Sequence, residues 1–542
     1  MSSSRFLNLK SFQATWLHFG DLLLYAGVIV AAHYFSVYLD YGSFFKGLSL
    51  SLEIHTFHLH ILPFIFFVFF RYLVFWPDAS AKHHQTTFIF ALLLYGFLAR
   101  VVLYWSGVST QWSVGIYAAP LNHWLHLWDF EMLFYADALR VVFLLLTHFL
   151  LLICFFLLRP TLAVDPKGNW AVGALLVLWV QLIFTFTAAD LFLFFVAFES
   201  LMIPLLFLIG IWGSPNRVQA NNYLYFYTTA GAVGMLLSIL YLWQALETTD
   251  LFVLTVLVET ALSWSEKRWL WLGFFLSFAI KTPLVPFHIW LPKAHVEAPT
   301  TGSVLLAGLL LKIGLYGLLR ICLGLFPGVR AWAAPLVSTL AVVGIVYASL
   351  ITLRQVDMKR IIAYSSVAHM SLSLARVMTG QPLGVAAGVY LSLSHGIVSS
   401  ALFILVGALY GRFHNRLVRY YGGLITWMPY FGLFFFFFSL ANMAFPLTSG
   451  FMGEFLCLTS ILAQNSLLGI LAARSMLFRT VYAMLLFNRV FCGSLKLHLV
   501  LRHTATWRSL DLTPNELLIL MPCALITVYF GIFPSALLMN YF

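Results

Sequence analysis

Four ionisable residues lie within long apolar stretches of the sequence. They are Glu199 in LFLFFVAFESLMIPLLFL, Lys281 in FFLSFAIKTPLVPFHIWLP, Lys312 in VLLAGLLLKIGLYGLLR and Glu454 in ANMAFPLTSGFMGEFLCL. A charge at the centre of a bilayer costs at least about 2.5–3.5 kcal/mol, so such residues usually have a function. Two acids and two bases in this setting predict proton transfer. The structural alternative is that they form buried ion pairs between helices, or that the lysines extend to the membrane surface.

Sequences that break helices flank two of these residues. Prolines follow Lys281, and a proline and two glycines precede Glu454; they are Pro283, Pro286, Pro292, Pro446, Gly450 and Gly453. An interrupted helix exposes backbone groups that only protein or a water-filled cavity can satisfy at membrane depth. Two interrupted segments, each with one ionisable residue, are typical of a transporter with two inverted repeats, here of five spans each.

Three histidines are candidate proton carriers, because an imidazole exchanges protons near neutral pH. His288 lies on the interrupted segment after Lys281, whereas His369 and His395 each have serines about one helical turn away. Hydroxyl groups beside an imidazole can hold ordered water. For each histidine, a buried structural role is an equal alternative.

No residues form a recognisable cofactor site. The cysteines, residues 154, 322, 457, 492 and 523, have no paired spacing, and the sequence contains no glycine-rich nucleotide-binding loop. The histidines of HTFHLH at 55–60 could ligate a metal, but a position at the end of a span is favoured over ligation. We therefore expect no cofactor and no metal in this chain.

The composition places these residues in a membrane. Of the 542 residues, 62% are hydrophobic and 9% are charged, and the mean hydropathy is +0.94. A bilayer core about 30 Å thick needs roughly 20 mainly apolar residues per helix, whereas barrel strands would be about 10 residues long and alternating. The sequence predicts an all-α, polytopic membrane protein of about 14 helices. The predicted spans are 55–77, 87–105, 132–158, 171–189, 190–213, 222–246, 269–292, 300–325, 332–353, 358–378, 383–411, 425–462, 465–492 and 515–539, and the stretch 22–38 is an extra span or an interfacial helix.

Basic residues are distributed unequally between alternate loops. Loops after odd-numbered spans hold 14 lysines and arginines, and loops after even-numbered spans hold three, Lys267, Arg268 and Arg330. Since basic residues are retained on the side of insertion, the odd loops are expected in the matrix or cytoplasm. The net charge of +11 is dispersed, so topology explains it and no nucleic-acid partner is expected.

The sequence motifs around the buried charges resemble those of a known family. KTPLVPFHIWLPKAHVEAPTTGSVLLAGLLLKIGLYGLLR resembles the antiporter-like membrane subunits of respiratory complex I, the proton-pumping NADH:ubiquinone oxidoreductase. TLRQVDMKRIIAYSSVAHMSL, LSHGIVSSALFILVGALYGR, RLVRYYGGL and ANMAFPLTSGFMGEF are similar to the subunit 4 branch of mitochondrial, plant- and protist-type complexes. The resemblance runs from about residue 187 to 492.

This resemblance implies fourteen helices with two inverted five-helix repeats, whose seventh and twelfth helices are broken. The implied layout is an N-terminal extension at 1–50, peripheral helices at 51–170, repeats at 171–325 and 326–492, and a loop with the last helix at 493–542. The proton-translocating residues it implies are Glu199, Lys281, Lys312 and Glu454, with His288, His369 and His395 on a hydrated axis.

The resemblance also implies a setting. The chain would be a subunit of a proton-translocating NADH:ubiquinone reductase in the mitochondrial inner membrane, among other complex I subunits, especially neighbouring antiporter-like ones, and bound phospholipid. FMN, iron–sulfur clusters, NADH and ubiquinone would belong to the parent complex. A cation/proton antiporter and a structural membrane spacer are the alternatives. Arg474 and Arg479 depart from the family pattern and should find acidic partners, carbonyls or water.

Overall fold

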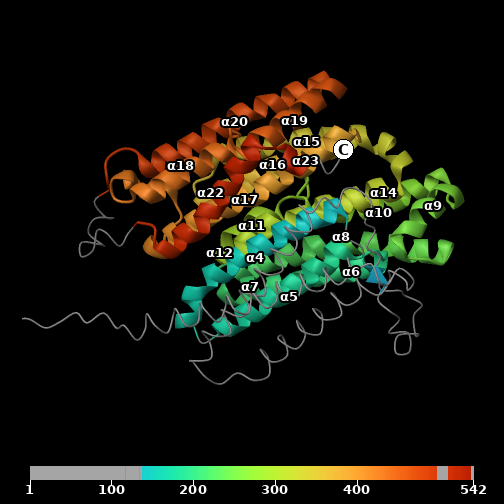
Figure 1. Ribbon diagram of the computed structural model, residues 1–542, viewed down its shortest axis with the longest axis horizontal. Coiled ribbons are helices and arrows are strands. Elements are labelled where there is room, and N and C mark those ends of the chain that lie inside the picture. Colours follow the sequence, from blue (N-terminus) through green and yellow to red (C-terminus); the bar gives the residue numbers. More distant parts are fainter. Residues whose placement is uncertain (1–115, 118–132, 135–136, 166, 497–510, 539–542) are drawn as a thin grey trace, which may run out of the picture. The chain divides into compact units, whose positions relative to one another are not determined.

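The computed structural model describes residues 116–117, 133–134, 137–165, 167–496 and 511–538. These residues are almost entirely helical (Figure 1), with one antiparallel pair of two-residue strands, β1 (Ile116–Tyr117) and β2 (Leu133–Phe134). The predicted spans 55–77 and 87–105, the apolar stretch 22–38 and the histidines of residues 55–60 lie outside this description.

The first group of helices runs from residue 138 to 325. Its members are α4 (Ala138–Val164), α5 (Gly168–Thr187), α6 (Leu191–Ser200), α7 (Met202–Trp212), α8 (Arg217–Leu246), α9 (Leu251–Ala261), α10 (Trp264–Lys281), α11 (Trp290–Glu297), α12 (Thr300–Leu305), α13 (Leu311–Gly317) and α14 (Leu323–Leu325). Two π-helical turns, Leu306–Leu310 and Leu318–Cys322, join α12, α13 and α14 into one continuous helix.

The second group runs from residue 327 to 538. Its members are α15 (Pro327–Arg354), α16 (Met358–Val377), α17 (Pro382–Phe413), α18 (Pro429–Asn442), α19 (Ser449–Gln464), α20 (Ser466–Phe491), α22 (Pro514–Ile532) and α23 (Ser535–Leu538). Short 3-10 turns at Val418–Tyr420 and Leu424–Thr426 lie between α17 and α18.

Within the described residues, nine helical segments are long and apolar enough to cross a membrane. The predicted spans that do not qualify are the two interrupted ones and the polar 358–378 span, which is α16. Because α16 is buried along nearly its whole length, it needs no apolar surface for lipid. The prediction of an all-α, polytopic membrane protein is confirmed.

One span boundary was predicted wrongly and one helix was missed. The third span was placed at 132–158, but α4 begins at Ala138, because residues 133–134 pair as a strand. No helix was predicted between the spans 222–246 and 269–292, yet this stretch contains the apolar helix α9, which Asp250 caps by accepting from the Phe252 N–H. The interruption predicted within the span 425–462 is confirmed, because α18 and α19 are separated by residues 443–448.

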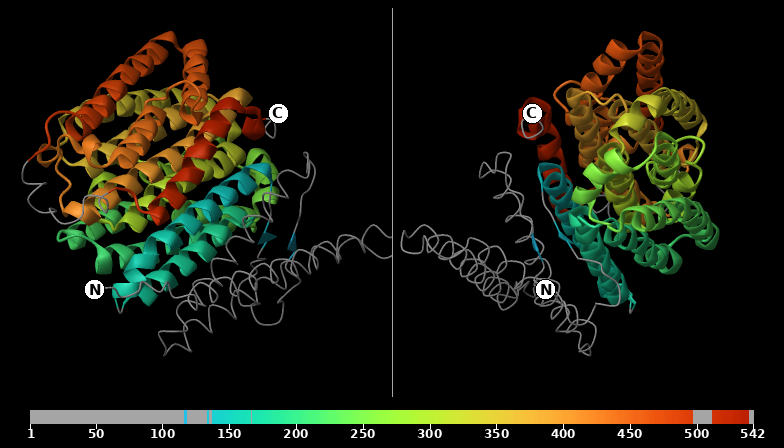
Figure 2. Two further views of the ribbon diagram at one scale, coloured as in Figure 1. Left: turned by 60° about the vertical axis from the view of Figure 1, so that its left-hand side comes forward. Right: turned by 90° about the vertical axis from the view of Figure 1, so that its right-hand side faces the viewer.

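Two helices form the buried centre of the described region. In the most apolar 18-residue stretch of each helix, 100% of the residues are buried in α17 and 89% in α12–α14, but only 22% in α22. Glycines bring the two central helices close together: a Cβ on Gly396 of α17 would lie 3.2 Å from the Gly308 carbonyl oxygen. Figure 2 shows the red helix α22 at the outside of the described helices, in agreement with its low burial.

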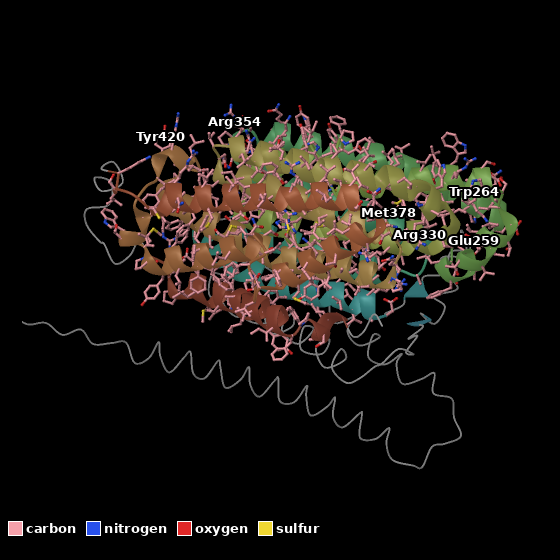
Figure 3. All side chains as sticks on the ribbon, turned by 90° about the horizontal axis from the view of Figure 1, so that it is seen from above. Glu259, Trp264, Arg330, Arg354, Met378 and Tyr420 are labelled. Atoms are coloured by element: carbon pink, nitrogen blue, oxygen red, sulfur yellow. The ribbon has the colours of Figure 1, made fainter. Side chains whose placement is uncertain are left out.

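The connections group at two ends of the helices. In Figure 3, Arg354 and Tyr420, from connections after odd-numbered spans, lie at one end, and Glu259, Trp264 and Arg330, from connections after even-numbered spans, lie toward the other. This alternation is the arrangement that the loop count assumed. Which end faces which compartment stays a prediction.

The crossing of α8 and α10 gives a test of helix packing. A Cβ on Gly273 would lie 2.8 Å from the Gly234 carbonyl oxygen, whereas one on Gly173 of α5 meets nothing within 4 Å. We expect Gly273→Val to destabilise the protein by about 1–3 kcal/mol through overpacking, and Gly173→Val to have little effect. The thermal unfolding midpoints in detergent check this; equal midpoints would contradict the packing.

Candidate functional site

Lys281 is the last residue of α10, and a network of hydrogen bonds holds the chain where this helix stops. The Leu284 N–H donates to the Ala279 carbonyl at 2.8 Å, and the buried Trp290 indole donates to the Ile280 carbonyl at 2.9 Å. The prolines that follow remove further N–H donors, so the chain cannot continue as a helix. The predicted interruption is confirmed, and it fixes the position of Lys281.

Lys281 meets Glu199 at a second irregular point, the junction of α6 and α7. Its ammonium donates to the Phe198 carbonyl at 2.8 Å and lies 3.4 Å from Glu199 Oε1. The Lys281 side chain is 3% exposed and that of Glu199 is 19% exposed. The sequence identified both residues, and the structure brings them together.

Lys312 lies on α13, directly after the first π-helical turn. Its ammonium is fully buried and donates to the carbonyl of Ala307, within that turn, at 2.6 Å. It also lies 2.9 Å from Nδ1 of His395 on α17. π-Helical turns free backbone groups for other partners and are frequent at functional sites. The irregular turn therefore supplies part of the solvation that lipid cannot give.

His395, His369 and Glu454 continue this line of contacts. The imidazole centroids of His395 and His369 are 5.3 Å apart, and His369 Nδ1 lies 2.9 Å from Glu454 Oε1. Glu454 is 1% exposed. The structure thus brings Lys312, His395, His369 and Glu454 into one buried array. Three helices, α16, α17 and α19, supply its last three members.

A second interrupted segment positions Glu454. Between α18 and α19 the backbone of Ala444 and Leu447 has positive φ, at 61° and 72°, which costs of order 1–3 kcal/mol per residue. The hydroxyls of Ser394 and Ser449 are 2.7 Å apart and join α17 to the first turn of α19. Packing against neighbouring helices therefore holds the strained segment that aims Glu454 inward.

Arg479 supplies the charge that faces Glu454. Its NH1 group donates to Glu454 Oε1, and both side chains are 1% exposed. Of the partners expected for this arginine, an acid, a carbonyl or water, the structure shows an acid. Arg474, on the same helix α20, is exposed.

His288 lies apart from these contacts. It is buried against the rings of Tyr347 and Tyr364, at centroid distances of 5.4 and 6.3 Å. A role in proton transfer for His288 stays a prediction.

Sequence reasoning missed two buried groups near the end of α11. Lys359 was not among the predicted site residues, yet its ammonium is buried and donates to the Ala298 carbonyl at 2.7 Å and to Ser303 Oγ at 3.3 Å. His295 is fully buried and stacks on Phe403 of α17 with ring centroids 4.7 Å apart. For Lys359, the available sequence signal was that the α16 segment is polar along its length, which indicates a buried helix. For His295, the only signal was that it lies near an interrupted span.

Several imidazole nitrogens have no hydrogen-bond partner in the protein. They are Nε2 of His369, Nε2 of His395, Nδ1 of His288 and both ring nitrogens of His295. Buried polar atoms in native proteins are nearly always bonded to protein or to ordered water. These atoms are therefore expected to bind water. Within the described residues, no group of three or more histidine, cysteine or acidic side chains could hold a metal.

Comparison with known proteins places this array in a family. The profile of the family described as "NADH:quinone oxidoreductase/Mrp antiporter, TM" matches residues 188–479, more than half of the chain. The chain belongs to this family. The match includes every candidate residue from Glu199 to Arg479, and it confirms the resemblance drawn from the sequence motifs.

Individual family members agree with this assignment. The chain is 44% identical over 403 residues to NADH-ubiquinone oxidoreductase chain 4 of Arabidopsis thaliana, covering 74% of this chain and 79% of that relative. It resembles a chain of respiratory complex I from Thermus thermophilus with a TM-score of 0.75 and 27% identity, covering 88% of this chain and 96% of that one. A chain of the Mrp complex from Dietzia sp. matches with a TM-score of 0.74 over 91% of this chain and 96% of that one, and its 19% identity shows the fold alone.

The hydrogen bond at the end of α10 can be tested with two tryptophans. Trp290 and Trp271 are 2% and 1% exposed, but only the Trp290 indole has a hydrogen-bond partner. Trp290→Phe leaves the Ile280 carbonyl unsatisfied, so we expect about 1–3 kcal/mol more destabilisation than Trp271→Phe causes. Thermal unfolding of the purified variants measures the difference. Equal losses of stability would mean that this hydrogen bond does not stabilise the interrupted end of α10.

Proposed function

We propose that this chain is a proton-translocating membrane subunit of an NADH:ubiquinone oxidoreductase, and that its buried Glu, Lys and His residues form the proton route. The observation that carries the proposal is the array Lys312–His395–His369–Glu454. A bilayer opposes isolated charges, so an aligned set of exchangeable groups is expected to mark a proton path. In this proposal, residues 171–325 and 326–492 are two inverted repeats, each with one interrupted helix.

The hydrogen-bond directions favour proton transfer along the array. A charged Lys312 ammonium can only donate, so His395 Nδ1 accepts and its proton lies on Nε2. A Glu454 carboxylate can only accept, so His369 Nδ1 donates and its Nε2 has a free lone pair. The two Nε2 atoms without protein partners are thus a donor and an acceptor. Water between them would complete a chain of donors from Lys312 to Glu454.

Lys281 and Glu199 form the switch of the first repeat. While the Glu199 carboxylate lies close, the Lys281 ammonium holds its proton; when the pair separates, the proton passes towards Lys312. Leaving one partner of a buried pair alone costs about 3–5 kcal/mol. Moving one charge against 100 mV needs about 2.3 kcal/mol. Separation of the pair is therefore sufficient to drive one step, and Glu454 is the group that releases the proton on the far side.

The parent complex supplies the redox chemistry in this proposal. It would carry FMN and iron–sulfur clusters and would oxidise NADH and reduce ubiquinone, while this chain moves protons with its own side chains. The chain would lie in the mitochondrial inner membrane, with its odd-numbered loops toward the matrix and bound phospholipid at its surface. Neighbouring antiporter-like subunits would cover its exposed helices, among them α8 and α22.

A cation/proton antiporter is the second candidate, because the family description includes Mrp antiporters. The 44% identity to a chain 4 relative, against 19% identity to an Mrp chain, favours the first proposal. Purification separates the two functions. Copurification with flavin and iron–sulfur clusters supports the oxidoreductase, whereas sodium-dependent proton exchange by an assembly without them supports the antiporter.

The proposal predicts the effect of removing single charges. Lys281→Ala and Glu454→Ala should leave an assembled complex, yet lose most of the coupled proton pumping and ubiquinone-linked turnover. Lys293→Ala, which removes a lysine that lies over the Tyr223 ring, is a control for loss of charge elsewhere. Proton uptake into sealed vesicles and NADH oxidation measure the two activities. Wild-type rates in fully assembled Lys281 and Glu454 variants would refute these roles.

A further inference from the structure

Arg479 is a buried charge that the proposed relay does not use. Its guanidinium on α20 donates through NH1 to Glu454 Oε1, and its NH2 group lies 3.5 Å from Ser475 Oγ. The same NH1 group is 3.4 Å from His369 Nδ1. Arg479, Glu454 and His369 therefore meet at one point, where Arg479 NH1 faces both the Glu454 carboxylate and an imidazole nitrogen.

The chemistry of the imidazole allows only one of its two contacts at a time. His369 Nδ1 donates to Glu454, 2.9 Å away, when it carries a proton. It accepts from Arg479 only when it has a free lone pair, because a guanidinium has no acceptor. The contacts of this nitrogen are therefore alternatives, and the position of one proton decides between them.

We propose that Arg479 is a positioning residue that exchanges its NH1 hydrogen bond between Glu454 and His369 as the proton moves. This inference rests on the proposed function of the relay. In the transfer, His369 Nε2 takes up a proton delivered through water from the His395 side of the relay, the Nδ1–H bond breaks with its electron pair left on nitrogen, and an O–H bond forms on Glu454 Oε1, so that the imidazole stays neutral. The carboxylate becomes neutral, and Arg479 NH1 then donates to the vacated Nδ1 lone pair. Return of the proton restores the ion pair.

Two features of the surroundings fit this exchange. Arg479 lies on the last helix of the second proposed repeat, as Lys312 lies on the last helix of the first, so each repeat ends in a buried base. A small cavity next to the cluster is lined by Ser365, Ser439, Asn442 and Tyr482, among others. Ser365 precedes His369 by about one helical turn and Tyr482 follows Arg479 by about one turn, so two polar residues of the cavity lie one turn from members of the cluster.

The test compares variants of Arg479 in the assembled complex by infrared spectroscopy of carboxylic acids. Arg479→Met removes the charge, Arg479→Lys keeps the charge without the planar fork, and Arg474→Met is the control on the exposed face of the same helix. Difference spectra between each variant and the same variant carrying Glu454→Gln isolate the band of protonated Glu454. NADH-driven proton pumping is measured on the same preparations.

We expect at least about a tenfold rise in the protonated Glu454 band in Arg479→Met, because the buried carboxylate loses its counter-ion. We expect no rise in this band in Arg479→Lys or Arg474→Met. Of these two variants, only Arg479→Lys should pump several-fold more slowly, because an ammonium is a point charge without the planar hydrogen-bonding geometry of a guanidinium. An unchanged band in assembled Arg479→Met would overturn the inference. Should that variant fail to assemble, wild-type pumping by Arg479→Lys would overturn it. Normal pumping by Glu454→Gln would instead refute the proposed function of Glu454.

Discussion

The structure depends on one constraint: a charge buried among apolar helices must find its compensation within the protein. Lipid offers neither counter-ions nor hydrogen bonds, so an unpaired charge or backbone group costs several kcal/mol. Each buried charge of the site is compensated. Lys281 is bonded to Glu199 and the Phe198 carbonyl, Lys312 to the Ala307 carbonyl and His395, and Glu454 to Arg479 and His369.

Irregular backbone supplies much of this compensation. Lys281 ends a helix and bonds a carbonyl at the α6–α7 junction, and Lys312 bonds a carbonyl of a π-helical turn. Glu454 follows a segment with strained residues at Ala444 and Leu447. Regular helices would have used these backbone groups internally, so the interruptions and the buried charges belong to one arrangement. Close helix packing, through glycines such as Gly396, keeps that arrangement fixed.

The sequence predicted much of this site because buried charges and helix breakers are local signals. Glu199, Lys281, Lys312 and Glu454 stood out against their apolar surroundings, and Arg479 was expected to find an acidic partner, a carbonyl or water. The contacts between helices were harder to predict: nothing in the sequence near Lys359 shows that Ala298 and Ser303 lie beside it. The short helix α9 was missed because it was too short for a span, and the start of α4 because strand pairing with residues 116–117 is non-local.

The most direct test of the account is a density map of the assembled protein that resolves ordered water between His395 and His369. The account predicts water within about 2.7–3.2 Å of both Nε2 atoms, joining the Lys312 half of the array to the Glu454 half. Apolar side chains packed against both nitrogens, with no density for water, would contradict it, because protons could not then pass between the two histidines.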